Sequence, residues 1–286
     1  MRVSGFTFLR NAEINGYPFI ESIKSILPIV DEFICAIGPS DDNTKEMVLA
    51  INDDRIKVIE TAWNENMHDR GFVYGQQKMV AQYNCSGDWA FYLEADEVLH
   101  EKELPQIQNA MRRHLVNPDV EALYFNFHHF YGTAKQVGIA GYRKAPRIIR
   151  NNIRTIAPDG LFWVVLDKNK KGRYPKAMSA DGNIYHYGHC RSIAKMAEKL
   201  KRIGKYWGVN NQKFEGYGKI DLAEIRQFHG SHPKVMDWWL ANEAEKTFCQ
   251  DPSFRPSRRD IRNRARFAIE EIFNIEISKK HFKALD

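Results

Sequence analysis

The sequence predicts an α/β fold with a mostly parallel central sheet flanked by helices, followed by a C-terminal helical region. In the first third of the chain, short apolar runs typical of β-strands alternate with segments whose apolar residues have helical spacing. Strands separated by helices form βαβ units, in which the strands lie parallel in one sheet. Beyond about residue 190 the strand-like runs stop and helical spacing continues.

The N-terminal elements justify the βαβ interpretation. The predicted strands are 3–9, 32–37, 56–60 and 89–93, and the predicted helices are 17–27, 44–51 and 72–83. Pro28 ends the first helix, because proline cannot continue the hydrogen-bond pattern. The segment GPSDDN at 38–43 is a dense turn signal after the second strand.

The middle and C-terminal parts of the chain add further elements. They are a helix at 102–115, strands at 122–130, 147–150, 161–166 and 183–187, and helices at 192–208, 234–248 and 258–277. Ser192 is a good N-cap and Gly208 a good terminator for the first of these late helices. We therefore expect a catalytic α/β domain at 1–190 and a helical region at 191–286 packed on it.

The composition is that of a globular protein. With 286 residues, 43% hydrophobic and 27% charged, the chain can bury the core of one large domain. No apolar run approaches the roughly 18 residues that span a bilayer, and the N-terminus lacks the features of a signal peptide. The four cysteines form no CxxC pair, which fits a reducing compartment. We expect a cytoplasmic protein.

Positive charge is concentrated near the C-terminus. The net charge is +6, and the segment RPSRRDIRNRAR at 255–266 holds six arginines and one aspartate. This segment is interpreted as a solvated helix face, as a site for an anionic membrane or acidic acceptor, or as a nucleic-acid patch. Nucleic acid ranks last, because no RNA- or DNA-binding motif accompanies the charge. We expect peripheral contact with the inner face of the membrane through this segment.

The segment DWAFYLEADE at 88–97 leads a predicted strand directly into a cluster of acids. Glu94 and Asp96 are two positions apart, so they point the same way at the carboxyl end of the strand, where open α/β sheets bind ligands. Adjacent carboxylates repel unless a cation joins them, and Mg²⁺ or Mn²⁺ prefers such oxygen ligands. The alternative is that these acids are solvated loop residues before the next helix.

Four segments in this order resemble the GT-A glycosyltransferases, in particular family 2 and its relatives that build bacterial surface polysaccharide. The segments are VSGFTFLRNAE, IVDEFICAIGPSDDNT, SGDWAFYLEADEVL and IYHYGHCR, and the resemblance extends over residues 1–190. It implies a GT-A fold, a nucleotide-sugar donor and a Mn²⁺ or Mg²⁺ cofactor.

The resemblance also implies site residues. Asp96 matches the last acid of the family's DxD-type motif and is the expected main metal ligand, with Glu94 at the first position of the motif. His186 is the expected third ligand, and His189 is the second choice. The expected nucleotide-sugar-binding residues are Phe8, Leu9, Arg10, Ser40, Asp42, Lys78, Glu94 and Arg191. Two alternatives for the histidines are a zinc site built from the HxxH pairs and a structural role.

The chain departs from the family pattern in two places. Ile37 stands where the family often has an acid that pairs with uracil, which leaves the base of the donor open. Trp163 and Val164 stand where relatives have a His-Glu pair, so the general base is also unsettled. Asp159, a turn acid before Phe162 and Trp163, is the first candidate, and Asp181 is the second. The alternative for Asp159 is a plain Asp-Gly turn.

The sequence therefore predicts a metal-dependent glycosyltransferase that moves a sugar from a nucleotide-sugar to a glycan, lipid-linked or other hydroxyl acceptor. Surface polysaccharide or glycoconjugate synthesis is the expected pathway. One alternative is a sugar-phosphate nucleotidyltransferase, but the segment RNAEINGYPF after the first strand lacks the Gly-rich, basic loop of that class. The other is a catalytically inactive binding protein with the same fold.

Overall fold

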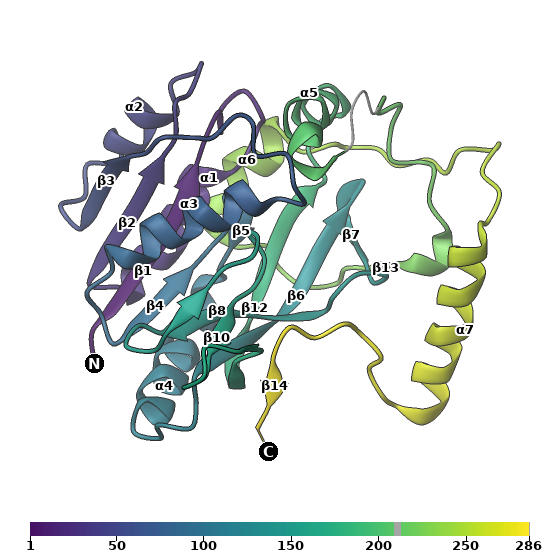
Figure 1. The fold of residues 1–286 in the computed structure, drawn as a ribbon. Coiled ribbons are helices and arrows are strands. Elements are labelled where there is room, and N and C mark those ends of the chain that lie inside the picture. Colours follow the sequence, from purple (N-terminus) through teal and green to yellow (C-terminus); the bar gives the residue numbers. More distant parts are fainter. Residues whose placement is uncertain (209–212, 286) are drawn as a thin grey trace.

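The N-terminal half of the central sheet is parallel. In the computed structural model, which describes residues 1–208 and 213–285, its strands lie in the order β3-β2-β1-β4 (Figure 1). These strands are β1 (Val3–Leu9), β2 (Glu32–Ile37), β3 (Ile56–Glu60) and β4 (Trp89–Tyr92). The connecting helices are α1 (Phe19–Ile26), α2 (Thr44–Leu49) and α3 (Phe72–Tyr83). Each neighbouring pair of these strands is parallel, so the predicted α/β class is confirmed.

Antiparallel strands extend the sheet beyond β4. They are β8 (Lys144–Arg150), β6 (Ala122–Tyr131), β7 (Thr133–Gly138) and β13 (Ile225–Gln227), in that order across the sheet. The long strand β12 (Lys176–His189) runs parallel to β6 and antiparallel to the short strand β5 (Glu97–Val98). Its other end pairs with β14 (Lys283–Ala284). A separate small sheet contains β9 (Thr155–Ile156), β10 (Val164–Leu166) and β11 (Gly172–Arg173).

Helices cover both faces of the sheet. On one face, α1 and α4 (Leu104–Leu115) bury Ile23 and Ile107 in a cluster with Trp89 and Phe91. On the other face, α3 buries Met79 against a cluster that includes Phe6 and Trp163. Because both faces are covered, β2 and β4 are buried along their whole lengths, as expected for central strands of an α/β sheet.

The later helices are shorter than the sequence predicts. They are α5 (Ile193–Ile203), α6 (Asp237–Asn242) and α7 (Arg258–Phe273). Short 3₁₀ turns occur along the chain at Leu27–Ile29, Glu101–Glu103, Gly204–Trp207, Leu222–Glu224 and Lys234–Met236. The helix expected at 258–277 ends at Phe273, because Asn274 adopts a left-handed conformation with φ of 50°. Among the described residues, no helix has the length and apolarity needed to cross a bilayer.

The region after residue 190 also contributes strands to the main sheet. Strands β7, β13 and β14 are not predicted from the sequence, and β13 and β14 come from this C-terminal region. Figure 1 shows α7 standing at the margin of the molecule, away from the parallel strands. The division of the chain at residue 190 stays a prediction.

Candidate active site

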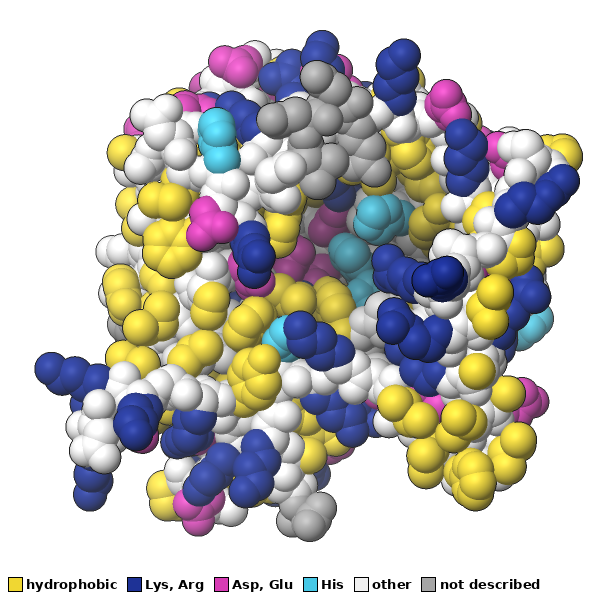
Figure 2. Space-filling model, turned by 45° about the vertical axis from the view of Figure 1, so that its right-hand side comes forward, with side chains coloured by type: hydrophobic (Ala, Val, Ile, Leu, Met, Phe, Trp, Pro, Cys, Tyr) yellow, Lys and Arg dark blue, Asp and Glu magenta, His cyan; other side chains and the backbone are white. Residues whose placement is uncertain are grey.

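A cavity of about 640 Å³ opens at the carboxyl ends of β1 and β4. Its walls come from the segments after these two strands, from the end of β12, from α5 and from the following turn at Gly204–Trp207. Figure 2 shows the hollow at the centre of one face, with histidine and acidic side chains inside it. The position is the one at which α/β sheets usually bind ligands, because the strand ends leave a crevice between loops.

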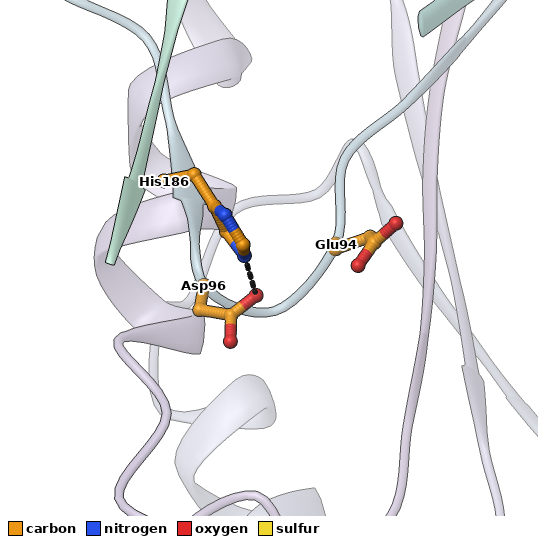
Figure 3. A group of neighbouring side chains, drawn as sticks. All are labelled: Glu94, Asp96 and His186. Carbon is orange, nitrogen blue, oxygen red and sulfur yellow. Dashed lines mark ion pairs between the residues drawn. The ribbon is translucent and has the colours of Figure 1, made fainter. Parts of the chain in front are cut away.

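Glu94, Asp96 and His186 meet at the base of this cavity. One potential ligand atom from each residue lies within 4.8 Å of those of the other two (Figure 3). The pairing of β12 with β5 places His186 opposite Glu97, and His186 Nε2 then lies 3.4 Å from Asp96 Oδ1. The register of these two strands therefore joins residues that are 90 positions apart.

Three cationic or ionisable groups surround Asp96. Arg191 Nη2 and Lys199 Nζ lie 3.0 Å and 3.3 Å from Oδ2, while His186 faces Oδ1. Burial by itself would raise the pKa of Asp96, but Lys199, His186 and Arg191 together hold that pKa well below its usual value. Burial, followed by the charge of Arg191, lowers the pKa of Lys199 to about 8. Asp96 is therefore an anion with one oxygen directed toward His186.

Glu94 is in a different electrostatic environment. Burial, followed by the charge of Glu97, raises the pKa of Glu94 to about 7. Arg147 is fully buried, with Nη2 3.0 Å from Glu94 Oε1 and 2.5 Å from Glu97 Oε1. Glu97 is also fully buried, so it forms an internal ion pair. Two carboxylates thus share one guanidinium, and a second cation on the cavity side would stabilise the ionised form of Glu94.

A chain of hydrogen bonds orients His186. His129 Nε2 donates to the carbonyl of Tyr142 at 2.7 Å, and His129 Nδ1 lies 2.7 Å from His186 Nδ1. Burial, followed by the charge of His186, lowers the pKa of His129, so its ring is neutral and its Nδ1 accepts. His186 therefore donates through Nδ1 and directs Nε2 toward Asp96.

The residues at this site fit a divalent cation. Two carboxylates and an imidazole nitrogen converge, and the second nitrogen of the imidazole is hydrogen-bonded, as is usual for metal-ligating histidines. Burial lowers the pKa of His186, but the charge of Asp96 outweighs it and raises that pKa overall. Without a cation, a proton can thus occupy the position between the two side chains. Cation binding would replace this proton.

Aromatic side chains line the other end of the cavity. They are Phe8, Trp63, Tyr74, Tyr206 and Trp207. The ring centroids of Phe8 and Tyr74 are 5.8 Å apart, and those of Tyr74 and Trp207 are 5.9 Å apart. Sequence reasoning found Phe8 and missed the other four, because they come from three distant segments with no shared local pattern. Flat ring faces of this kind can stack on a nucleobase.

The structure brings together many of the predicted site residues. Those that line the cavity are Phe8, Leu9, Arg10, Glu94, Asp96, His186 and His189. Arg191 lies behind Asp96 with Nη1 donating to the Asn15 carbonyl, so its guanidinium is occupied by protein groups. Basic residues also line the cavity from α5 and from the turn after it, and these are Lys199, Lys201, Arg202 and Lys205.

Ser40 and Asp42 form hydrogen bonds between two loops. Ser40 Oγ accepts from the backbone N–H of Asn11 at 3.0 Å, and Asp42 Oδ2 accepts from that of Ile14 at 2.9 Å. These bonds join the loop after β2 to the loop after β1. The cavity is lined instead by their neighbours Asn11 and Asp41.

Lys78 is neither on the cavity wall nor solvated. Its Nζ donates to the carbonyl of Gly160 at 3.1 Å and lies 3.6 Å from the ring centre of Trp163. Burial, followed by the charge of Arg147, lowers the pKa of Lys78 well below its usual value. This side chain holds the turn at Gly160 against α3, and a direct contact with a diphosphate would require it to leave this enclosure.

The two candidate bases lie outside the cavity lining. Asp159 Oδ1 accepts from the backbone N–H of Leu161 at 2.8 Å, so this side chain closes its own turn, while Gly160 and Leu161 border the cavity. Asp181 forms an ion pair of 2.6 Å with Arg113 near the end of α4. The structure thus places Asp159 next to the site and Asp181 away from it.

Comparisons with known proteins give one sequence match. Residues 17–158 match the model of the family described as glycosyl transferase family 2. No curated protein matches the chain.

Solved structures match with low sequence identity. TarS of S. aureus has 14% identity and a TM-score of 0.41, over 71% of this chain and 39% of TarS. TarS 1-349 in complex with UDP-GlcNAc has 14% identity and a TM-score of 0.36, over 53% of this chain and 46% of that chain. Glucosyl-3-phosphoglycerate synthase from Mycobacterium tuberculosis, in complex with Mn²⁺, UDP and phosphoglyceric acid, has 18% identity and a TM-score of 0.32, over 46% and 43%. The chain thus spans less than half the length of the first of these proteins.

Proposed function

We propose, from the match of residues 17–158 to glycosyl transferase family 2, that this chain is a glycosyltransferase of GT-A fold that transfers a sugar from a nucleotide-sugar to a hydroxyl acceptor with the help of Mn²⁺ or Mg²⁺. One observation carries the proposal. A single cavity contains the Glu94, Asp96 and His186 cluster, a group of aromatic rings and a row of basic side chains. These groups are suited to bind the cation, the base and the phosphates of a nucleoside diphosphate.

The donor is placed by three kinds of side chain. The base stacks among Phe8, Tyr74 and the other aromatic rings, which exclude water from its faces. Lys199 and Arg202 of α5, which line the same cavity, face the diphosphate. Glu94, Asp96 and His186 would hold the cation, whose charge would help to neutralise the leaving diphosphate.

We also propose the class of the acceptor and the residue that acts as its general base. We expect a glycan or lipid-linked hydroxyl in surface polysaccharide or glycoconjugate synthesis, in the cytoplasm. Asp159 is the better placed of the two candidate bases, because its turn borders the cavity; using it would require the bond to Leu161 to open. Asp181 is engaged by Arg113 outside the cavity.

Release of nucleotide from a donor panel tests the proposed function. Purified protein is incubated with UDP-, GDP-, dTDP- and CMP-sugars, with Mn²⁺, with Mg²⁺ or with a chelator. We expect nucleotide release from at least one donor with a cation, and loss of this activity with chelator and in Asp96→Asn. The matched control is Asp54→Asn, at an exposed aspartate on a turn that does not line the cavity, which should retain activity. Ordinary turnover by Asp96→Asn, or no release from any donor, contradicts the proposal.

A further inference from the structure

Helix α7 packs on the rest of the molecule through one face only. Asn263, Phe267 and Glu270 are buried, with Asn263 Nδ2 donating to Glu224 Oε1 at 2.5 Å and Glu270 paired with Arg143. With a rotation of about 100° per residue, Ile261 and Ile272 fall on the opposite face. These two side chains are 60% and 75% exposed. The helix therefore has an apolar face that the described residues leave uncovered.

This face continues into the segment after the helix. The apolar patch consists of large exposed side chains, which are Ile261, Ile269, Ile272, Phe273, Ile275 and Ile277. Figure 2 shows apolar side chains gathered beside basic ones at its lower right, on the side where α7 lies. Single exposed apolar residues are ordinary, but a contiguous group of this size marks a surface that contacts something else.

Arginines border the apolar patch. Arg258, Arg259 and Arg262 are exposed, and within the described part of the chain they form no ion pair. Arg264, by contrast, is paired with Asp221 at 2.6 Å. The acid of the first helical turn, Asp260, is occupied in the N-terminal cap of α7 with Ser257. The start of α7 thus carries cations that form no ion pair in the described part of the chain, and most of the apolar patch lies toward the end of the same helix.

We propose that this face of α7 docks on an anionic lipid bilayer. Isoleucine and phenylalanine side chains enter the interface between headgroups and acyl chains, while the arginines contact lipid phosphates. Charge favours this partner over a second copy of the chain. Two copies that met through this face would both bring unpaired arginines to the contact, whereas an anionic bilayer supplies the opposite charge.

Docking at α7 would also hold the cavity close to the membrane. Arg266 Nη2 donates to the carbonyl of Ala140 at 3.0 Å, and Arg143 pairs with Glu270. These contacts fix α7 to the segment that contributes Tyr142 to the cavity wall. If the acceptor is lipid-linked, the same docking would bring the site toward the bilayer that holds it, a consequence that rests on the proposed function.

Vesicle co-sedimentation tests the docking surface by itself. The full chain is mixed with vesicles of phosphatidylcholine alone or of phosphatidylcholine with phosphatidylglycerol, at low and high salt. We expect binding to the anionic vesicles only, weakened by salt. Replacing Ile272 and Phe273 with Ser, or Arg258, Arg259 and Arg262 with Gln, should each lower the partition by about tenfold or more.

Matched controls separate this surface from general stickiness. Exposed apolar residues elsewhere are changed in Tyr83→Ser with Val116→Ser, and exposed lysines in a triple Gln variant of Lys168, Lys170 and Lys171. Both controls should bind like the parent, and donor hydrolysis should be unchanged in every variant. Equal binding by parent and α7 variants, or no binding by the parent, overturns the proposal. So does a dimer, measured by light scattering, that the Ile272 and Phe273 changes convert to monomer. If one of the two α7 variants fails to fold, vesicle binding by the other variant still tests the proposal.

Discussion

At the scale of single residues, the site depends on how its two carboxylates differ. Asp96 is kept ionised by three neighbours, whereas burial and then Glu97 raise the pKa of Glu94 to about 7. One carboxylate is therefore a permanent anion and the other is close to half protonated near neutral pH. The difference arises because Asp96 faces Lys199, His186 and Arg191, whereas Glu94 shares the guanidinium of Arg147 with Glu97.

Cation binding should consequently depend on pH. A ligand carboxylate must lose its proton before it binds a metal, so affinity falls as pH decreases through the pKa of Glu94, at about 7. The raised pKa of His186 acts in the same direction. We expect Mn²⁺ affinity, measured by calorimetry, to fall between about pH 8 and pH 6. In Glu94→Gln the affinity should be lower and its pH dependence shallower, since only His186 still releases a proton. An unchanged slope in that variant would remove Glu94 from the ligand set.

His129 should act as a positioning residue for His186. Replacing it with Ala removes the acceptor of the His186 Nδ1 proton, which frees the ring to rotate and to change tautomer. We expect Mn²⁺ affinity to fall by about 10- to 100-fold, with nucleotide binding in the absence of metal unchanged. His189→Ala, at another histidine of the cavity wall, is the matched control and should have a smaller effect. Equal effects of the two changes would mean that the hydrogen bond has no special role.

At the scale of elements, one buried acid joins three segments of the parallel sheet. Glu32, at the start of β2, accepts from Ser4 Oγ of β1 at 2.7 Å and from the backbone N–H of Ser86 at 2.8 Å. It also pairs with Lys57 Nζ of β3 at 2.8 Å. Burial would raise the pKa of Glu32, but Lys57, Ser4 and Ser86 together lower it to about 2. The charge of Glu32 therefore stabilises the edge at which β1, β2 and β3 begin.

Acid should weaken the protein partly through this residue. Because the folded pKa of Glu32 lies below the unfolded value near 4.3, its contribution is complete above that value and is lost as pH falls toward 2. The shift corresponds to a contribution on the order of 2–3 kcal/mol. We expect Glu32→Gln to have a lower free energy of unfolding at neutral pH and a smaller further loss on acidification, measured by urea denaturation. A parallel pH profile for parent and variant would contradict this account.

At the scale of the whole molecule, the cavity is assembled from segments of both chain halves. Arg10 of the loop after β1 donates to Tyr206, and Tyr206 donates to Glu65 at 2.9 Å. The backbone N–H of Gly71 also donates to the Tyr206 carbonyl at 2.7 Å. These contacts close the aromatic end of the cavity with residues from three distant stretches. A ligand bound there would contact all three stretches in the folded protein and lose those contacts on unfolding.

Donor nucleotides should accordingly stabilise the folded chain. At about 100 times Kd a ligand adds ~2.7 kcal/mol, which corresponds to an increase in Tm of about 5–10 °C for a domain of this size range. We expect such an increase for one nucleoside diphosphate with Mn²⁺, measured by thermal unfolding, and the responding base identifies the donor class. Asp96→Asn should lose the cation-dependent part of the increase. The same increase in parent and variant would separate nucleotide binding from the proposed metal site.

The sequence alone determined the elements whose signal is local. Strands β1, β2 and β3 and helix α3 have the predicted bounds, because their apolar periodicity and their turn residues lie within each segment. Glu94 and Asp96 could also be recognised from local sequence, because they directly follow a buried strand and no distant partner is needed to identify them. Resemblance over four short segments added the fold and the class of enzyme, both of which agree with the family match at residues 17–158.

Only the tertiary structure decided which side chains complete the site. His129 and Arg147 reach the acidic cluster through the register of β6, β8 and β12, while Lys78 is enclosed against Trp163. Asp181, which has the local appearance of a site acid, is paired with Arg113 away from the cavity. Contacts between residues far apart in the chain depend on strand register and packing, whose free energy is spread over many buried groups. No short segment contains that information, so the partners of a charge can be read only from the folded chain.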